Sequence, residues 1–375
     1  MATTEGFTTD QFQGVREVLA NSIESGADVG ASVAVYSKGE LVVDIWGGHL
    51  DETRSAPWVA DTIVNVWSTT KTMTFLVALM LADRGELDFF APVVKYWPEF
   101  GANGKASIEV RHLLSHSAGL SGWAAPMVPE DLADWERCTA NLAAQAPWWE
   151  PGTASGYHAL TQGYLIGEVV RRITGTSIGS FFASEVATPL GADFHIGLPA
   201  SQEHRVSMVI PPSELNLDGV PVDSIAYRTL TSPAVDATMP QHRWWRAAEI
   251  PAANGHGNAR SVATIQSIIA NRGRFHDQEF FSPATSDLIF ETQQNGIDLV
   301  LGTEFRFGMG YGLSTSVMPL GPRSCFWGGF GGSVIIMDQD LELTVAYMMN
   351  KMRVGLVGDT RGSDLAVAAT MAALS

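Results

Sequence analysis

Residues 65–75 read NVWSTTKTMTF and place Ser68 three residues before Lys71, where an apolar strand-like run changes to helical spacing. Side chains at positions i and i+3 of a helix lie on the same face, so the Ser68 hydroxyl and the Lys71 amine can come within hydrogen-bonding distance. Such a pair is suited to acyl transfer if the lysine is neutral and accepts the serine proton. The alternative is that Ser68 caps the helix and Lys71 is a first-turn surface residue.

The catalytic role depends on a lowered lysine pKa. Moving it from about 10.4 to near 7 takes roughly 4 to 5 kcal/mol of differential stabilisation. A poorly hydrated helix N-terminus, with its positive dipole, acts in that direction. Because the S-x-x-K spacing also occurs by chance, other residues must decide between the two roles.

Strand patterns lie at both ends of the chain. Residues 31–48, ASVAVYSKGELVVDIWGG, predict a hairpin that turns at Ser37–Glu40, and residues 324–351 predict two or three further strands. Helical patterns at about 9–25 and at 362–374 flank these segments. We therefore expect an α+β fold with one antiparallel sheet built from both ends of the chain and flanked by the terminal helices.

The 375 residues exceed the size at which single cores stop growing, so two lobes are expected. Residues 1–88 and 251–375 are predicted to form a discontinuous sheet domain. Residues 89–250 are predicted to form a mostly helical inserted domain, because segments such as 107–120 and 161–175 have helical spacing. The helix after Ser68 is apolar around most of its circumference and has a glycine stop at Gly85, so it should be buried at the junction, with the active site in the cleft between the domains.

Charge and apolar pattern restrict the partners. The chain has 23 basic and 40 acidic residues, a net charge of -17, and no Lys/Arg cluster, so neither nucleic acid nor an anionic membrane is an expected partner. The longest apolar run, residues 75–82, is too short to span a bilayer, and the first ten residues lack the pattern of a signal peptide. A cytoplasmic location is expected.

Cys138 and Cys325 have no spacing suited to a disulfide framework or a zinc site, so no metal is expected.

Two further motifs follow in order. Tyr157 lies in GTASGYHAL (152–160), and Trp327-Gly328-Gly329 lies just before a predicted strand. With Ser68 and Lys71, this order resembles the serine β-lactamase and penicillin-binding protein superfamily, and most of all the family VIII carboxylesterases, relatives of class C β-lactamases. The resemblance extends over most of the chain and includes LLSHSAGL (113–120) and PAANGHGNARSVA (251–263). It implies a β-lactamase/transpeptidase-like fold.

The resemblance also implies the roles of the residues. Ser68 would be the acylated nucleophile, Lys71 its general base or proton shuttle, and Tyr157 the group that passes a proton to the leaving group and helps to activate water. The backbone N–H groups of Ser68 and Phe330 would form the oxyanion hole. No metal or organic cofactor is implied. Whether Lys71 or Tyr157 is the base in acylation stays open, because coupled groups share their proton.

The sequence departs from the β-lactamase pattern at two positions. Trp327 stands where β-lactamases carry the lysine of K-T-G, and Tyr157-His158-Ala159 replaces the Y-x-N of class C enzymes. Both changes remove polar contacts to a lactam or peptide, and Trp327 offers an apolar surface instead, so a small neutral ester with a short-chain or aryl group is the expected substrate. Gly328 and Gly329 would let the backbone approach it closely. The further candidate substrate contacts are Trp123, His158 and His256, and the tryptophans that could line the rim of the cleft are Trp148, Trp149, Trp244 and Trp245.

A second serine and a further histidine are competing candidates. Ser177 is the centre of G-x-S-x-G at 175–179, but it follows a helical segment rather than a strand, so it is expected to cap the next helix. His116 is expected to be a hydrogen-bonded structural residue.

Other functions on the same fold stay open. They are an amide hydrolase acting on β-lactams, D-amino-acid peptides or nylon-type oligomers, an acyltransferase, and a non-catalytic binding relative. The complete set of Ser68, Lys71 and Tyr157 argues against the last of these. The sequence contains no signal for the oligomeric state.

Overall fold

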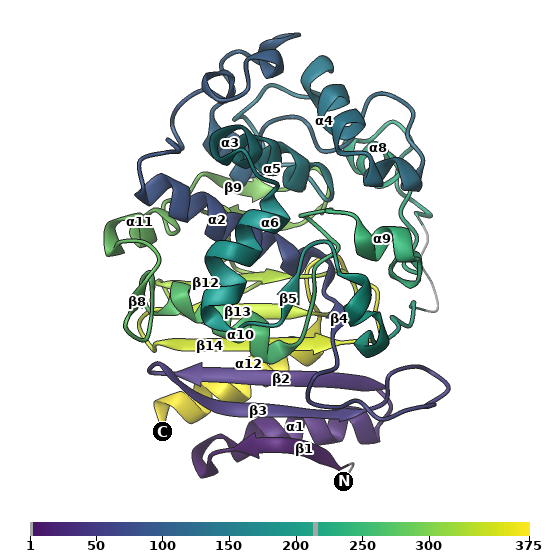
Figure 1. Cartoon of the computed structure of the whole chain (residues 1–375), viewed down its shortest axis with the longest axis vertical. Coiled ribbons are helices and arrows are strands. Elements are labelled where there is room, and N and C mark those ends of the chain that lie inside the picture. Colours follow the sequence, from purple (N-terminus) through teal and green to yellow (C-terminus); the bar gives the residue numbers. More distant parts are fainter. Residues whose placement is uncertain (1–2, 213–216) are drawn as a thin grey trace.

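The computed structural model describes residues 3–212 and 217–375 and contains one nine-stranded antiparallel sheet (Figure 1). In this sheet β2 pairs with β14 from Ala31 opposite Met349 to Ser37 opposite Leu343, which joins the N-terminal strands to the C-terminal ones. The predicted sheet built from both ends of the chain is therefore confirmed. From edge to edge its strands are β1 (Thr4–Thr8), β3 (Glu40–Gly48), β2 (Gly30–Ser37), β14 (Leu343–Met349), β13 (Val334–Asp338), β12 (Ser324–Gly328), β11 (Gly312–Leu313), β10 (Glu304–Phe307) and β9 (Gln294–Ile297).

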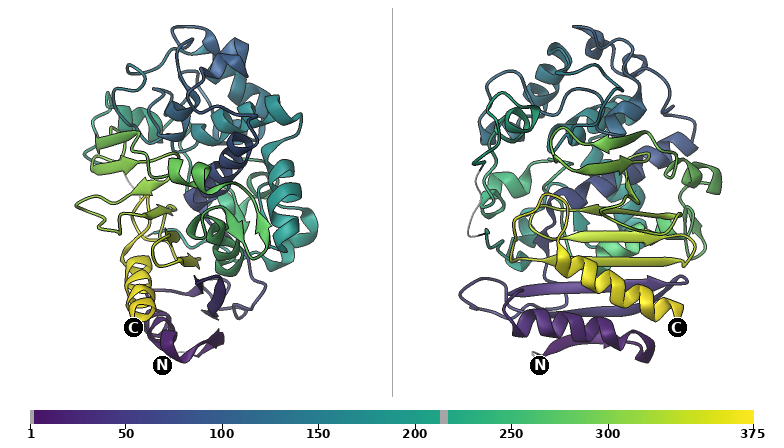
Figure 2. Two further views of the ribbon diagram at one scale, coloured as in Figure 1. Left: turned by 90° about the vertical axis from the view of Figure 1, so that its left-hand side faces the viewer. Right: turned by 180° about the vertical axis from the view of Figure 1, so that it is seen from behind.

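Helices cover both faces of the sheet, which explains why every residue of β2 and β14 is buried. The terminal helices α1 (Gln13–Glu24) and α12 (Thr360–Leu374) pack together on one face, as the view from behind shows (Figure 2). On the other face α10 (Ala259–Ala270) packs against β2, β13 and β14. The predicted terminal helices are confirmed, although residues 10–12 form a separate 3₁₀ turn before α1. The edge strands β1 and β9 had no counterpart in the sequence prediction.

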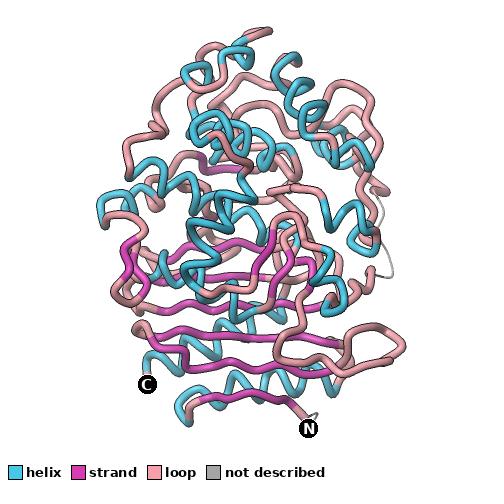
Figure 3. Tube along the Cα trace, viewed as in Figure 1, coloured by secondary structure: helices cyan, strands magenta, loops and turns pink. Residues whose placement is uncertain are grey.

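The other helices are spread from the level of the sheet to the end of the molecule away from the two termini (Figure 3). They are α3 (Val110–Leu114), α4 (Trp135–Ala144), α5 (Thr161–Thr174), α6 (Ile178–Phe182), α7 (Thr188–Leu190), α8 (Ile225–Leu230), α9 (Arg243–Ala247) and α11 (Pro283–Leu288). Two small sheets complete the structure, one of β4 (Val64–Asn65), β6 (His256–Gly257) and β5 (Phe194–His195), the other of β7 (Arg274–Phe275) and β8 (Gln278–Glu279). Strand β5 pairs with β6 across the proposed boundary at residue 250, so the exact domain limits stay a prediction.

The helix α2 (Lys71–Asp83) runs through the middle of the molecule. Every side chain from Lys71 to Leu81 is buried, and the left-handed Gly85 follows the end of the helix, as expected for a buried helix with a glycine stop. Ser68 is not its N-cap. It lies inside a 3₁₀ turn, Trp67–Thr70, that connects β4 to α2, and no side-chain cap bond forms at either start.

None of the helices in the two described ranges combines the length and the apolar character of a membrane-spanning segment.

The start of α10 provides a test of the fold. The Asn258 side chain accepts a hydrogen bond from the Ser261 N–H (2.9 Å), and the Ser261 hydroxyl oxygen accepts one from the Asn258 N–H (3.1 Å). We expect Asn258→Ala to lower the free energy of unfolding by about 1 kcal/mol, because one N–H at the helix start loses its partner. Asn258→Asp keeps the acceptor and should stay close to the wild type. Chemical denaturation measures both, and equal stability of Asn258→Ala and the wild type would contradict the cap.

Candidate active site

Three side chains meet at the junction of α2 with the helical part of the chain. Ser68 comes from the 3₁₀ turn, Lys71 from the first position of α2, and Tyr157 from the loop before α5. The Tyr157 hydroxyl donates a hydrogen bond to Ser68 Oγ at 2.6 Å, and Lys71 Nζ lies 3.1 Å from the same oxygen. The Ser68 side chain is thus held between a phenol and an amine. It is 7% exposed, so an incoming molecule can reach it from one side only.

Lys71 is fully buried, so the alternative that it is a surface residue is wrong. Its amine donates to the carbonyl oxygens of Ala159 (2.7 Å) and Ala252 (2.9 Å). Among the residues that the structure describes, no carboxylate forms an ion pair with it, and burial lowers its pKa well below the ordinary value. A neutral amine has two N–H donors for the two carbonyls and one lone pair that can face the Ser68 hydroxyl. The surroundings therefore fit the form of lysine that accepts a proton.

Tyr157 is also buried, and burial raises the pKa of its phenol, so the hydroxyl keeps its proton. Its backbone N–H donates to Asp298 Oδ1 at 3.0 Å. The same carboxylate oxygen accepts from the N–H groups of Val300 and Leu301, both at 2.9 Å. Asp298 thus ties the Tyr157 loop to the 298–301 loop. The sequence analysis missed this residue, because a single aspartate outside any motif carries no signal of its own.

The third motif reaches Ser68 through its glycines. A Cβ atom on Gly329 would lie 2.4 Å from the Val66 carbonyl oxygen and 3.3 Å from the Ser68 nitrogen, so only glycine allows this approach of the end of β12 to the 3₁₀ turn. Ser333 strengthens the contact by donating its hydroxyl to the Val66 carbonyl (2.8 Å). Within the described ranges, no group accepts a hydrogen bond from the N–H of Ser68 or of Phe330. Two free donors therefore exist at the predicted oxyanion hole, whose role stays a prediction.

The expected place of the Trp327 side chain is wrong. The indole is fully buried, stacks on His116 with ring centres 5.5 Å apart and meets Phe75 edge-on at 5.4 Å. Enclosed in this way, it offers no open apolar surface to a substrate. Its ring centre lies 6.0 Å from that of Tyr157, so it packs behind the phenol and supports it.

His158 is also enclosed, and its role as a substrate contact stays a prediction. Its Nε2 accepts from the Leu120 N–H (3.1 Å), and its Nδ1 bonds with the Gly156 carbonyl (2.6 Å). Burial lowers the pKa of the imidazole to about 3, so it is neutral and connects the loop at 120 with the loop that carries Tyr157. His116 has the structural role expected of it, because its Nδ1 accepts from the His158 N–H (3.0 Å) in a fully buried position.

Trp123 and His256 are enclosed as well, and a substrate contact at either side chain stays a prediction. Trp123 is 2% exposed and donates to the Cys138 carbonyl at 3.0 Å. His256 is fully buried next to Asn65 in the β4–β6 pairing, and burial lowers its pKa to about 3. Of the tryptophans considered for the rim, Trp245 is buried, whereas Trp148, Trp149 and Trp244 are partly exposed.

Two aromatic side chains beside the nucleophile, those of Trp67 and Phe330, were not predicted from the sequence. Trp67, which directly precedes Ser68, has a left-handed backbone (φ 49°) and packs against Phe330 and Trp245, with ring centres 5.2 and 5.6 Å away. Because Trp67 directly precedes Ser68 in the sequence, its presence at the site could have been predicted from this position.

The second candidate serine has the structural role predicted for it. Ser177 is the N-cap of α6, since its side chain accepts from the Ser180 N–H, and its hydroxyl donates to Glu249 Oε1 at 2.6 Å. With its hydroxyl proton held by a carboxylate and no lysine or histidine contact, it lacks the surroundings of a nucleophile.

In residues 3–212 and 217–375, no group of three or more His, Cys, Asp or Glu side chains is placed to hold a metal ion. Cys138 and Cys325 are both free and buried. A hollow of about 320 Å³ lies between the 301–305 and 356–357 segments, and one of its lining residues, Val357, packs against Gly328.

The chain was compared with known proteins. The model of the Beta-lactamase family matches residues 15–368. A family VIII carboxylesterase of known crystal structure is 39% identical, with a TM-score of 0.93 and coverage of 99% of this chain and 100% of that chain.

Two relatives are named as esterases. The esterase/beta-lactamase LipL of Mycobacterium tuberculosis is 35% identical over 341 residues, covering 88% of this chain and 78% of LipL. The esterase EstB of Burkholderia gladioli is 27% identical and covers 88% of each chain. The chain therefore belongs to the Beta-lactamase family, as a serine hydrolase similar to the family VIII carboxylesterases.

Proposed function

We propose that the protein hydrolyses short-chain or aryl carboxylic esters through an acyl-enzyme on Ser68. The observation that supports this most is the pair of contacts on Ser68 Oγ, a protonated phenol at 2.6 Å and a buried amine at 3.1 Å. One group can take a proton and the other can give one, as an acyl transfer requires.

In the acylation step, Ser68 Oγ attacks the ester carbonyl carbon while its proton passes to Lys71 Nζ. The negative charge that forms on the carbonyl oxygen is stabilised by the N–H groups of Ser68 and Phe330, each worth about 2.7 to 4 kcal/mol in the transition state. The bond to the leaving alcohol oxygen then breaks. Tyr157 gives its proton to that oxygen. Lys71 then passes to Tyr157 the proton that it took from Ser68.

In the deacylation step, water takes the place of the alcohol. The Tyr157–Lys71 pair accepts a proton from the water as its oxygen attacks the acyl carbon. The bond between the acyl carbon and Ser68 Oγ breaks, and Oγ recovers its proton. The carboxylic acid is released and the three side chains return to their starting protonation states.

A neutral substrate suits the surroundings of Ser68. Trp327 replaces the cation that would hold a carboxylate, and Ala159 stands where class C enzymes have an amide side chain. Phe330, which is partly exposed and packs against Trp67, gives the surroundings of the nucleophile an aromatic surface that favours an apolar or aryl group on the ester. Hydrolysis of a β-lactam amide is the second candidate, because the relative LipL is named for both activities, as an esterase/beta-lactamase.

Two serine substitutions test the nucleophile. Ser68→Ala should reduce kcat for p-nitrophenyl butyrate by on the order of 10³-fold or more, because no other hydroxyl is placed between the amine and the phenol. Ser177→Ala is the matched control and should keep kcat within about twofold, with a small loss of stability from the missing cap. Loss of activity in a well-folded Ser177→Ala protein would contradict the mechanism.

The substrate class is tested by comparing p-nitrophenyl butyrate with nitrocefin on the wild-type protein. The ester should have the larger kcat/KM. A larger kcat/KM for nitrocefin would make the protein a β-lactamase. A phosphonate ester should add its mass to the peptide that contains Ser68, and labelling of any other peptide would contradict the acyl-enzyme assignment.

The pH dependence tests the protonation states. Burial lowers the pKa of Lys71, so the reactive neutral amine predominates above that lowered pKa, and kcat/KM should rise as pH increases through it. Because burial raises the pKa of Tyr157 above its usual 10, ionisation of the phenol should cause no loss of rate below pH 10. Tyr157→Phe should keep the rising limb at a much lower rate. A rising limb with an apparent pKa near that of free lysine would show that Lys71 is charged in the resting enzyme.

A further inference from the structure

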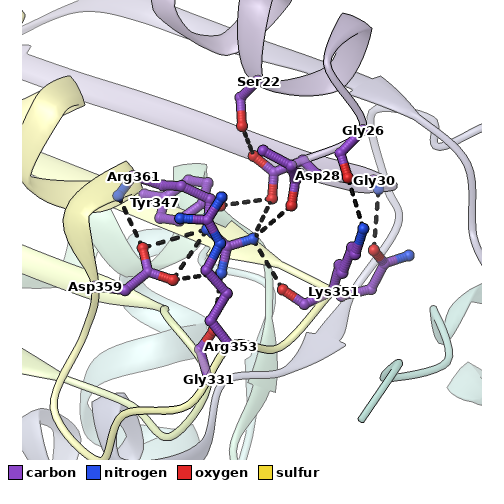
Figure 4. Close-up of polar contacts among 12 residues, drawn as sticks. Ser22, Gly26, Asp28, Gly30, Gly331, Tyr347, Lys351, Arg353, Asp359 and Arg361 are labelled. Carbon is purple, nitrogen blue, oxygen red and sulfur yellow. Dashed lines mark hydrogen bonds and ion pairs between the residues drawn. The ribbon is translucent and has the colours of Figure 1, made fainter. Parts of the chain in front are cut away.

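A buried ion cluster lies behind the glycine-rich turn that carries Phe330 (Figure 4). Its centre is Arg361, in the first turn of α12 and 5% exposed. The guanidinium pairs with Asp28 at 2.7 Å and with Asp359 at 2.5 Å. The Asp28 carboxylate also accepts from the hydroxyls of Tyr347 (2.7 Å) and Ser22 (2.5 Å). The cluster joins α1, the start of β2, β14 and α12.

All the donor groups of Arg361 are used inside the protein. Nε donates to Asp359, and Nη1 donates to Asp28 and to the carbonyls of Ala27 and Lys351. Nη2 donates to Asp359 and, at 2.9 Å, to the Gly331 carbonyl. Because a guanidinium is planar and its donors have fixed directions, anchoring it to two carboxylates also fixes the position of the Gly331 carbonyl.

Gly331 directly follows Phe330, in a turn that has little stiffness of its own. Gly331 and Gly332 have φ of 90° and 137°, and glycine backbones are the least restricted. A Cβ on Gly332 would lie 2.5 Å from Arg361 Nη2, so the absence of a side chain is what lets the guanidinium approach. The conformation of this turn therefore depends on its hydrogen bonds to other segments.

These hydrogen bonds leave one donor free. The N–H groups of Gly329, Gly331 and Gly332 donate to the carbonyls of Ser333, Gly355 and Gly329, respectively. The Gly331 carbonyl accepts from the Arg353 N–H (2.9 Å) as well as from Arg361. Within the described part of the chain, the N–H of Phe330 alone among residues 329–332 has no acceptor. The network holds the turn and leaves this N–H available to a ligand.

We propose that Arg361 is a positioning residue of the oxyanion hole: by holding the Gly331 carbonyl, it sets the direction of the Phe330 N–H. This inference rests on the proposed acyl transfer at Ser68. Loss of one complete oxyanion donor lowers kcat by about 10² to 10³-fold, so a donor that is present but misdirected should lose a part of that factor. The effect acts on the transition state, since the oxyanion charge develops only there.

The decisive variant is Arg361→Lys, which keeps a positive charge beside Asp28 and Asp359 but cannot bridge both carboxylates and the Gly331 carbonyl at once. We expect kcat for p-nitrophenyl butyrate to fall by about 10 to 100-fold, with KM within threefold. A trifluoromethyl ketone, whose adduct with a serine carries an oxyanion, should bind more weakly by a similar factor. The midpoint of the pH–rate profile should not move, because Lys71 does not contact the cluster.

Arg205→Lys is the matched control. Arg205 forms a similarly short pair with Asp193 (2.6 Å) and makes no contact with residues 329–332. It should lose stability without the selective loss of kcat and of ketone affinity. If Arg361→Lys does not fold, Arg361→Gln combined with Asp28→Asn removes the bridge without leaving Asp28 charged and unpaired, and the same kinetic changes are expected.

The outcomes separate two questions. A folded Arg361 variant with kcat and ketone affinity within twofold of the wild type would overturn the positioning role, as would a loss that Arg205→Lys reproduces. Turnover of nitrocefin but not of the ester by the wild-type protein would overturn the proposed substrate. The Arg361 comparison would then be made with nitrocefin and would still support or overturn the positioning role.

Discussion

The chemistry of the site and the packing around it depend on the burial of one amine, that of Lys71. Lys71 lies in the interior with two backbone carbonyls, a serine and a tyrosine around it, and burial lowers its pKa. A charged amine there would need a carboxylate partner, since the transfer of a lone ion into a protein interior is costly. The absence of such a partner among the described residues makes the neutral amine the stable form. The two carbonyls come from Ala159 and Ala252, so segments far apart in the chain must pack on α2 before the amine is enclosed.

The groups packed around Tyr157 are uncharged as well, which keeps the phenol in its protonated form. The imidazole of His116 packs against the phenol and the imidazole of His158 packs against His116, and burial keeps the pKa of both below the ordinary value. Neutral rings add no positive charge that would stabilise a phenolate. With the indole of Trp327, they form an uncharged aromatic layer that fixes the ring of Tyr157 and leaves its hydroxyl to Ser68. The carboxylate of Asp298, which holds the Tyr157 loop, is directed at backbone N–H groups instead.

Sequence patterns predicted the parts of the fold that rest on local periodicity. The hairpin of β2 and β3, the terminal helices and the buried α2 all have alternation or helical spacing that the structure reproduces. The edge strands β1 and β9 could not be predicted, because their residues are mostly exposed and have no apolar face. The spacing of Ser68 and Lys71, together with the family resemblance, was enough to predict that Tyr157 lies next to them. The burial of the candidate substrate contacts could not be predicted for a different reason: whether Trp123, His158 or His256 faces a cleft or the core depends on packing between distant segments, which residue type does not reveal. Asp298 and Arg361 act on the backbone of other loops, and such contacts leave no pattern in sequence.

The pairing of β2 with β14 also has a consequence for how the chain is made. The pairing that joins the N-terminal strands of the sheet to the C-terminal ones needs a strand from residues 30–37 and another from residues 343–349, so it cannot form until residues 343–349 have left the ribosome. Until then β2, whose eight residues are all buried in the finished protein, lacks its partner on one side. An unpaired apolar strand of this kind is a site for association with other nascent chains. The yield of folded protein in a cell should therefore depend on how quickly the segment between β2 and β14 is synthesised and on chaperones that cover this edge in the meantime.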